Sequence, residues 1–503
     1  MDEGKTVKNV TIRGEGLTIE QLELVALKSA NVSVAKSAVK AMNRSHKTVQ
    51  EIIKRGDAVY GVNTGFGKFS EVRITPEQLE TLQVNLVRSH ACGVGSPLPA
   101  SVVRMILVMK ANALSKGYSG CRPVVVQTLV DMANSDVIPV IPAHGSVGAS
   151  GDLAPLAHVA LVMIGEGEAF YRGRRMSGLA AMKKAGISTI TLGPKEGLSV
   201  LNGTQVSTAL AVAAWVRLER LAKAADLACA WTLHGVAGLT SAYDARIHEV
   251  RGHEGAKFSA ARIRRALKNS QILKSPESKR RVQDPYSLRC APQVHGAVWD
   301  IVHATKPVLE TEINGVTDNP IVFADSGEVI SGGNFHAEPI AFVSDQLAIA
   351  GAELANISER RTYLLTDPVS SGLPAFLVEQ GGLNSGFMIH QVTQAALVSA
   401  NKTLAHPASV DSIPTSAGKE DHVSMATWAG FKAFEIMDRA TDVLAIEVLA
   451  AAQAVDMRRP DKPSKVIEKL QSSLRKLVPP MKVDRVAVTD IANARKFLLE
   501  TEW

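Results

Sequence analysis

The sequence predicts a mainly α-helical protein, with a smaller mixed N-terminal region of residues 1–200 followed by a long helical bundle of residues 201–503. The chain has 503 residues, of which 46% are apolar and 21% charged, a globular composition with enough chain for a large core. Residues 201–503 hold long alanine-rich stretches that are apolar on more than one face, as buried bundle helices are. No linker rich in Pro, Gly and Ser separates the two regions, so we do not expect them to fold independently.

The N-terminal region mixes short elements. Residues 8–14, KNVTIRG, predict a short strand, and residues 17–29 predict an amphipathic helix. A longer helix is expected over residues 34–56, with Gly56 as its C-cap. Residues 75–93 begin with a threonine cap, a first-turn proline and an acidic residue, which predicts a further helix, and residues 100–117 predict another.

Five alanine-rich stretches predict the long helices of the bundle. They show no fixed repeat period, so we expect no solenoid, and so much apolar helix surface favours an oligomer. The stretches are residues 205–238, 291–313, 336–365, 386–405 and 419–456.

Cysteine content, apolar runs and charge narrow the class of protein. Cys92, Cys121, Cys229 and Cys290 form no CxxC pair and predict reduced thiols. The first residues hold no signal-peptide core, and no uncharged apolar run reaches the roughly 18 residues of a membrane span. We therefore expect a cytoplasmic protein without a membrane partner. The net charge is +7, but the basic stretch 257–281 lacks stacking aromatics, so we expect a solvated helical face and no nucleic-acid partner.

Residues 144–158, HGSVGASGDLAPLAH, place a turn of small residues before an apolar stretch. A plain loop, a phosphate cradle and a site of backbone chemistry all fit this composition. In Ala149-Ser150-Gly151 the glycine has no Cβ, so its amide nitrogen can approach the Ala149 carbonyl and close a five-membered ring. Loss of water, and then of the Ser150 hydroxyl as water, would leave an electrophilic methylene. Such closure needs a compressed turn held by its surroundings.

Residues 60–69, YGVNTGFGKF, come close to a P-loop but do not match it. Gly61 and Gly67 enclose five residues where the motif needs four, and Phe69 stands in place of the hydroxyl residue. Two interpretations stay open. The segment is a flexible turn with one aromatic anchor, or a mobile loop that carries the phenol of Tyr60 to a reaction centre.

Several histidines raise the question of a metal hydrolase. His144, His158, His336 and His422 are available, but none has the HExxH-like spacing of a zinc enzyme. The spacing therefore predicts no metal site.

Taken together, several segments resemble the histidine/phenylalanine/tyrosine ammonia-lyase family. GSVGASGDLAPLAH resembles the segment that forms its prosthetic group, and YGVNTGFG resembles its catalytic tyrosine loop. GLSVLNGTQ at 197–205 and VQDPYSLRCAPQVHG at 282–296 resemble its active-site segments, and EINGVTDNP, SGGNFHAEPIA, ISERR and GLNSGFMI also fit. The resemblance runs from about Tyr60 to about Met425 and implies the ammonia-lyase/fumarase-like helical fold.

The resemblance implies a catalytic group that the chain makes from itself. Ala149, Ser150 and Gly151 would cyclise autocatalytically to 5-methylidene-imidazol-4-one (MIO), which would hold the substrate amine without an external cofactor. Tyr60 would remove the β-proton as general base, and Arg289 would bind the substrate carboxylate as a planar fork. The implied substrate-binding residues are His90, Asn202, Gln283, Tyr286, Arg289, Phe335 and Glu420.

Two positions indicate the substrate. Ser89-His90 resembles the family members that act on histidine, whereas tyrosine lyases usually carry His-Leu there and phenylalanine lyases Phe-Leu. Glu420 falls where histidine-specific members have glutamate and phenylalanine-specific members have glutamine. A carboxylate and an imidazole can both hydrogen-bond a substrate imidazole, and a buried unpaired glutamate disfavours an apolar substrate. We therefore expect L-histidine to be converted to trans-urocanate and ammonia, the first step of histidine degradation.

The alternatives are a tyrosine or phenylalanine ammonia-lyase, an aromatic 2,3-aminomutase, or a non-catalytic member that lacks the ring. The presence of Tyr60, Ser150 and Gly151 argues against the last. One departure from the family lies beside the site, because Gly418-Lys419 stands where histidine-specific members typically have Asn-Gln, and Lys419 could alter the charge state of Glu420. The resemblance also implies a homotetramer whose subunits share active sites.

Overall fold

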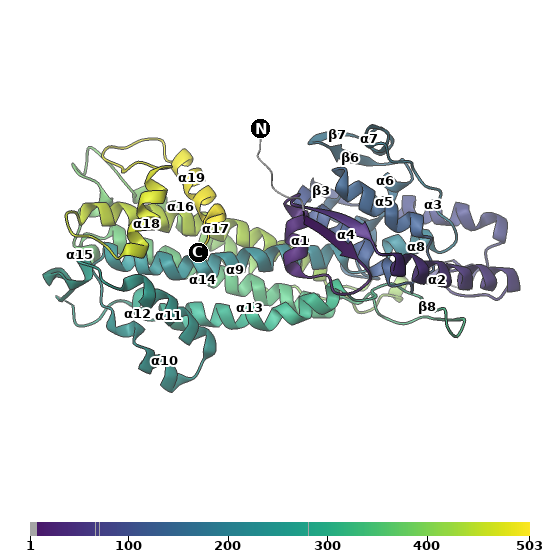
Figure 1. Ribbon diagram of the computed structural model, residues 1–503, viewed down its shortest axis with the longest axis horizontal. Coiled ribbons are helices and arrows are strands. Elements are labelled where there is room, and N and C mark those ends of the chain that lie inside the picture. Colours follow the sequence, from purple (N-terminus) through teal and green to yellow (C-terminus); the bar gives the residue numbers. More distant parts are fainter. Residues whose placement is uncertain (1–7, 66, 70, 280) are drawn as a thin grey trace. The chain divides into compact units, whose positions relative to one another are not determined.

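The computed structural model describes residues 8–65, 67–69, 71–279 and 281–503 (Figure 1). These residues form two compact units, each built from three segments of the chain. Unit 1 contains Met1–Ala213, Lys306–Asp345 and Pro407–Phe431, and unit 2 contains Ala214–Thr305, Gln346–His406 and Lys432–Trp503. The division at residue 200 stays a prediction, and the expectation of no signal-peptide core concerns in part residues 1–7, which lie outside the described residues.

Helices dominate both units, which confirms the predicted mainly α fold. The helices of the first 213 residues are α1 (Ile19–Ala26), α2 (Lys36–Arg55), α3 (Leu79–His90), α4 (Ala100–Ser115), α5 (Pro123–Asn134), α6 (Leu153–Met163), α7 (Gly178–Ala185) and α8 (Glu196–Leu201). Those of unit 2 are α10 (Ala245–Arg251), α11 (Glu254–Leu267), α12 (Tyr286–Arg289), α15 (Pro368–Ser371), α16 (Met388–Leu404), α18 (Lys465–Arg475) and α19 (Val488–Glu500). Four longer helices have residues in both units: α9 (Gln205–Gly235), α13 (Ala291–Ile313), α14 (Glu338–Thr366) and α17 (Ala426–Met457).

The strands are short and all lie in unit 1. β1 (Lys8–Ile12) pairs in parallel with β2 (Ala30–Val34), and Lys8 lies opposite Ala30. The other strands pair antiparallel: β4 (Val137–Pro139) with β6 (Glu168–Tyr171), β6 with β7 (Arg174–Ser177), β3 (Val94–Pro97) with β5 (Pro142–His144), and β8 (Ile321–Phe323) with β9 (Glu328–Ile330). Because β5 ends at His144, it fixes the start of the small-residue turn that follows.

Local capping signals account for the ends of several helices. α2 ends as predicted at Gly56, which takes the left-handed conformation with φ of 78° and caps the carbonyl of Ile52. The helix predicted from Thr75 is divided into a 3-10 turn at Pro76–Gln78 and then α3. The Thr75 side chain makes no capping hydrogen bond, so the proline rather than the cap marks this start.

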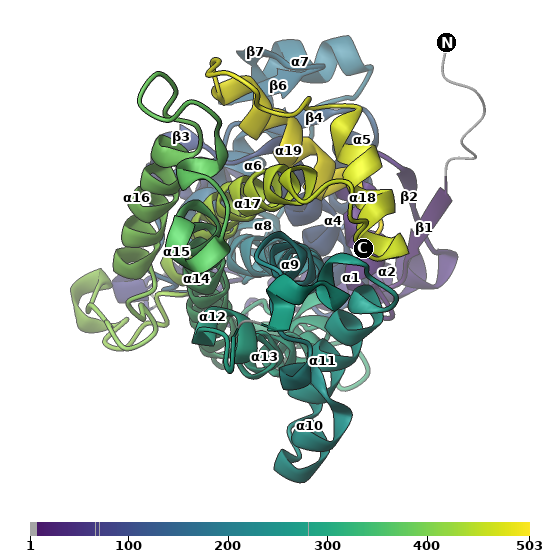
Figure 2. The same ribbon diagram turned by 90° about the vertical axis from the view of Figure 1, so that its left-hand side faces the viewer.

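The long helices of unit 2 are joined by a buried polar network. The guanidinium of Arg361 on α14 donates to both carboxylate oxygens of Glu447 on α17, at 2.5 and 2.7 Å, and neither side chain is exposed. Arg361 also contacts His295 on α13, whose other ring nitrogen bonds to Asp226 on α9. Figure 2 shows these helices lying side by side within unit 2. Satisfied buried charges of this kind fix how the helices face one another.

One helix, α14, is long and apolar enough by composition to cross a membrane, but 72% of its most apolar window is buried within the structure. A buried core helix passes the same test, so this is weak support for a membrane location. All four cysteines are free in the structure, with Cys121 and Cys229 buried and Cys92 exposed.

His234, at the end of α9, predicts a pH dependence of stability. It is fully buried, Nδ1 donates to the Ala230 carbonyl at 2.7 Å, and Nε2 accepts from the backbone of Ser464 at 3.2 Å. Burial lowers the pKa of His234 from 6.5 to about 4. Between these values the unfolded chain binds the proton and the folded chain does not, so the folded state loses stability as the pH falls, by up to about 1.4 kcal/mol per pH unit.

We expect His234→Gln to remove this contribution. The free energy of unfolding, measured by urea denaturation between about pH 7 and about pH 4.5, should fall less steeply with acid in the variant than in the wild type. His253→Gln, at an exposed histidine, should keep the wild-type slope. Equal slopes for His234→Gln and the wild type would contradict the assignment.

Candidate active site

The Ala149-Ser150-Gly151 turn has an unusual backbone. Gly148, Ser150 and Gly151 all have positive φ, of 79°, 52° and 73°. A serine rarely adopts this conformation, so the turn is held in place by its surroundings. The backbone of this tripeptide is therefore strained, and a strained turn is what the ring closure considered above would need.

Glycine is required at two positions of this turn, Gly148 and Gly151. Gly151 pairs with Gly203, and a Cβ on Gly151 would lie 2.2 Å from the Gly203 carbonyl oxygen. A Cβ on Gly148 would lie 2.2 Å from the hydroxyl of Ser424. The backbone of Asp152 donates to the same Gly203 carbonyl at 2.7 Å. The turn is thus pressed against the segment that precedes α9.

Asp152 ties the turn to two helices. Its carboxylate is fully buried, and one oxygen accepts from the backbone amides of Val206 and Ser207 in the first turn of α9, at 2.8 and 2.9 Å. The other oxygen accepts from the Thr427 hydroxyl on α17 at 2.6 Å. Burial raises the pKa of Asp152, while these donors favour its charged form. A buried carboxylate at the helix N-terminus also matches the positive end of the helix dipole.

A cavity of about 680 Å³ opens in unit 1 over this turn. It brings together six predicted site residues: Tyr60, Ala149, Ser150, Asn202, Phe335 and Glu420. Lys419, the departure from the family pattern, lines it as well. Gly151 is not among the lining residues, and it contacts Gly203. Segments far apart in the sequence therefore meet at one site.

Asn202 offers an unused acceptor to the cavity. Its side-chain Oδ1 is buried and has no hydrogen-bond partner among the described residues. Its main-chain carbonyl accepts from the ammonium of Lys110, a buried lysine on α4, at 2.5 Å. Burial lowers the pKa of Lys110 to about 8. An orphaned buried oxygen that lines a cavity is a place where a ligand N–H can bind.

Glu420 lies between the strained turn and its own loop. One carboxylate oxygen accepts from the Ser150 hydroxyl at 3.4 Å. The other accepts from the hydroxyls of Thr415 and Ser416, at 2.6 and 2.5 Å. Positive φ at Ser416, Ala417 and Gly418 folds the loop back so that these hydroxyls reach the carboxylate.

His90, the last residue of α3, is close enough to Glu420 for their charges to interact. Burial lowers the pKa of His90, and the backbone of Leu86 and the charge of Glu420 oppose this. Nδ1 lies 2.8 Å from the Leu86 carbonyl and so carries a proton, which leaves Nε2 as an acceptor. His90 is not among the residues that line the cavity.

Gln283, Tyr286 and Arg289 are grouped in unit 2. Gln283 and Arg289 line a cavity of about 340 Å³ there. The Arg289 guanidinium lies 4.3 Å from the centre of the exposed Tyr286 ring, and its Nε donates to the Asp284 carbonyl at 3.0 Å. The predicted site residues therefore fall into one group in each unit.

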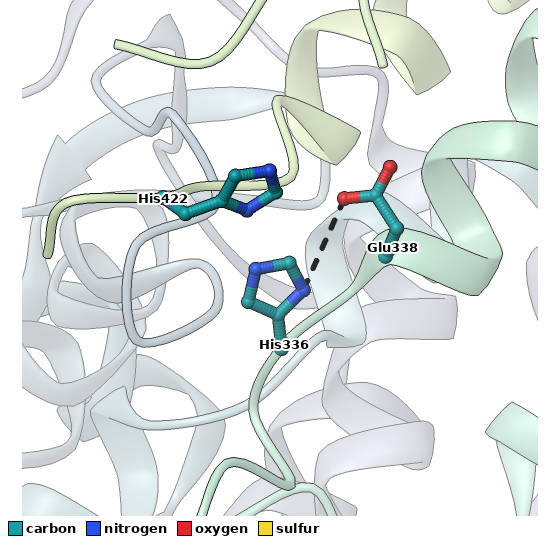
Figure 3. Close-up of side chains that lie close together, drawn as sticks. All are labelled: His336, Glu338 and His422. Carbon is teal, nitrogen blue, oxygen red and sulfur yellow. Dashed lines mark ion pairs between the residues drawn. The ribbon is translucent and has the colours of Figure 1, made fainter. Parts of the chain in front are cut away.

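Some residues at or near the site were not predicted as site residues. Lys110 interrupts the apolar stretch 100–117, and a charge inside a buried helix could have marked it. His336 and His422 both line the unit 1 cavity, and Glu338 lies next to them (Figure 3). Because 84 residues separate Glu338 from His422, no local spacing brings these three to notice.

The chain is similar over most of its length to known amino acid lyases and related enzymes. The family model described as aromatic amino acid lyase matches residues 17–476. The chain is 51% identical to a histidine ammonia-lyase of Caldanaerobacter subterraneus, over 96% of this chain and 95% of that protein. Among solved structures it resembles a histidine ammonia-lyase from Trypanosoma cruzi, at 42% identity and a TM-score of 0.91, covering 98% of this chain and 93% of that one. A tyrosine aminomutase from Streptomyces globisporus is also similar, at 35% identity and a TM-score of 0.91, covering 97% and 96%.

The family model covers nearly the whole chain, and its match includes every residue of both site groups. The strained small-residue turn and the residues around it thus lie within a chain related throughout to these lyases. The protein belongs to the aromatic amino acid lyase family.

Proposed function

We propose that this protein is an ammonia-lyase that converts L-histidine to trans-urocanate and ammonia, as the first step of histidine degradation. The observation that carries the proposal is Glu420, which accepts a hydrogen bond from Ser150 of the strained turn and is close enough to His90 to act on its pKa. A carboxylate that can accept a ring N–H beside the predicted electrophile suits an imidazole substrate. Relatives named histidine ammonia-lyase support the same substrate.

The Ala149-Ser150-Gly151 turn fits the MIO group of this family. Its positive φ angles and the close packing of Gly151 on Gly203 hold the backbone in the compressed form that ring closure needs. When formed, MIO supplies an electrophilic methylidene carbon that holds the substrate amine. Asn202 Oδ1, which is buried and unpartnered, would accept a hydrogen bond from that amine.

His90 and Glu420 would recognise the imidazole ring. Burial lowers the pKa of His90, so near neutral pH its Nε2 is an acceptor for a ring N–H. Thr415 and Ser416 hold one oxygen of Glu420, and the other points to Ser150 and the cavity. A phenyl ring offers neither group a hydrogen bond, so both would stay unpaired with an apolar substrate.

Tyr60 would take the β-proton as general base. It lines the same cavity as Ser150 and Asn202, and it follows α2 in a loop whose turn Gly61 makes possible. A Cβ on Gly61 would lie 2.7 Å from Pro320 and 2.8 Å from Leu198, so the loop is closely packed next to Tyr60. Phe335, which lines the cavity from the segment before α14, would pack against the substrate.

Arg289 would bind the substrate carboxylate, with Gln283 and Tyr286 beside it. Its Nε is engaged by Asp284 and its face by Tyr286, while its Nη groups have no hydrogen bond to the described residues. A planar guanidinium edge binds a carboxylate in a bidentate manner. We propose further that the protein works in the cytoplasm as a homotetramer in which subunits share active sites.

Substrate conversion by the whole protein tests the proposal. We expect purified protein given L-histidine, L-tyrosine or L-phenylalanine separately to release ammonia only from histidine, with the ultraviolet absorbance of urocanate. Peptide mass spectrometry should find residues 149–151 lighter by two water molecules. Ser150→Ala should abolish both results and keep the fold, whereas Ser326→Ala, in the exposed β8–β9 turn, should leave them unchanged. Coumarate or cinnamate as the product would favour a tyrosine or phenylalanine ammonia-lyase. A β-amino acid as the product would favour an aminomutase, an alternative that the similarity to tyrosine aminomutase supports.

Glu420→Gln and His90→Gln test the substrate assignment. Glu420→Gln replaces one carboxylate oxygen by an NH2 donor and removes the negative charge, and His90→Gln removes the ring nitrogen that would accept. Hydrogen bonds to charged groups contribute about 1.5–3 kcal/mol, so kcat/KM for histidine should fall about 10- to 100-fold in Glu420→Gln and less in His90→Gln. Steady-state kinetics would measure this, with Glu353→Gln on the exposed face of α14 as the control. Unchanged kcat/KM for histidine in both variants would contradict the roles of these two residues.

A further inference from the structure

Three potential metal ligands meet at the rim of the unit 1 cavity, and the proposed reaction uses none of them. His336 and Glu338 lie two residues apart at the start of α14, and His422 comes from the segment that precedes α17. One ligand atom from each lies within 4.8 Å of the others. Figure 3 shows the Glu338 carboxylate facing the two imidazole rings. His336 and His422 also line the cavity itself.

The carboxylate in this cluster lacks a partner. Oε2 of Glu338 is buried and has no hydrogen bond to the described residues. Its nearest cationic group is Nδ1 of His336, at 4.0 Å, which is too long for a hydrogen bond. Burial raises the pKa of Glu338, and the two histidines oppose this shift. An orphaned carboxylate oxygen is costly, and a cation between it and the imidazoles would satisfy it.

Packed residues hold both segments of the cluster. Ala337, between His336 and Glu338, is fully buried, as are Ile340 and Ala341 in the next turn of α14. Val423, which follows His422, is buried in a cluster with Ala408, Met425 and Ala429. The two rings lie nearly parallel, with centres 5.7 Å apart and an interplanar angle of 22°. The cluster is therefore built on fixed backbone rather than on free loop ends.

We infer that His336, Glu338 and His422 bind one divalent transition-metal ion of the zinc type. Two imidazoles and one carboxylate are the donor set of three-ligand zinc sites, whereas calcium and magnesium prefer all-oxygen sites. Zinc ligands at about 2.0–2.1 Å from the ion lie about 3.3 Å apart in a tetrahedron, so the three side chains must close by roughly an ångström around it. The fourth coordination position of the ion would stay open toward the cavity, which His336 and His422 both line.

Such an ion would link the two segments that carry Phe335 and Glu420. Phe335 is next to His336, and Glu420 is two residues before His422. Binding would restrain both segments at the cavity rim and so stabilise the protein by mass action. The inference is independent of the MIO group and of the identity of the amino-acid substrate.

Cobalt(II) is the probe that tests the site on the full-length, tag-free protein. After treatment with chelator and its removal, we expect one Co²⁺ per chain and a visible d–d absorption band without a thiolate charge-transfer band. Zn²⁺, titrated by calorimetry, should bind with the same stoichiometry and raise the apparent Tm. His422→Gln and Glu338→Gln should each weaken Zn²⁺ binding at least about tenfold and remove the Co²⁺ band.

Controls separate this proposal from other causes. His253→Gln, at an exposed histidine of unit 2, should bind both metals like the wild type. Ser150→Ala should lose turnover but keep metal binding, so failure of the proposed reaction and failure of the metal site are distinguishable. Circular dichroism in the absence of metal would verify the fold of each variant. The absence of a Co²⁺ band in the wild type, a thiolate band from the exposed Cys92, or unchanged Zn²⁺ affinity in both ligand variants would each overturn the inference.

Discussion

The contact between Gly151 and Gly203 is the constraint on which the rest of the unit 1 cavity depends. The carbonyl of Gly203 lies where a Cβ of residue 151 would be, and the same carbonyl accepts from the backbone of Asp152. A side chain on residue 151 would clash with this carbonyl, so the close approach requires glycine there. Beside this contact Ser150 has a positive φ, and its hydroxyl donates to Glu420. A backbone held in this way stores strain at the point where the proposed chemistry needs it.

Buried charges keep that contact in place. Asp152 joins the turn to the first turn of α9 and to Thr427, and Lys110 holds the carbonyl of Asn202 next to Gly203. Asp152 and Lys110 are both buried, and only a complete set of hydrogen-bond partners offsets the cost of removing such a charged group from water. The turn and the segment opposite therefore form one hydrogen-bonded assembly, and Val147 and Ala149 pack beside it against the buried Val423 cluster.

The sequence was informative where a pattern is local. The period and caps of residues 34–56 predicted α2 to within a few residues, because an amphipathic face and a terminal glycine lie within one short window. The turn at 149–151 and its glycines were also visible in one segment. The threonine cap at residue 75 was not formed, since Pro76 starts a 3-10 turn and the Thr75 side chain finds no amide to cap. Such competition between two start signals is decided by backbone geometry that the sequence does not display.

Contacts between distant segments could not be predicted from the residues alone. The hydroxyls of Thr415 and Ser416 reach Glu420 only because three successive residues adopt positive φ, two of them not glycine. Glu338 and His422 meet across 84 residues, so no motif spacing relates them. Resemblance to the family identified Glu420 and His90 as a pair, but it said nothing of the hydroxyls that orient the carboxylate. These hydroxyls hold one oxygen of Glu420, and the other oxygen lies beside Ser150. The loop that orients this carboxylate therefore also places it next to the proposed electrophile. A change in the loop at 415–420 would move the carboxylate relative to Ser150, so under the proposed function specificity and reactivity in this cavity would depend on one another.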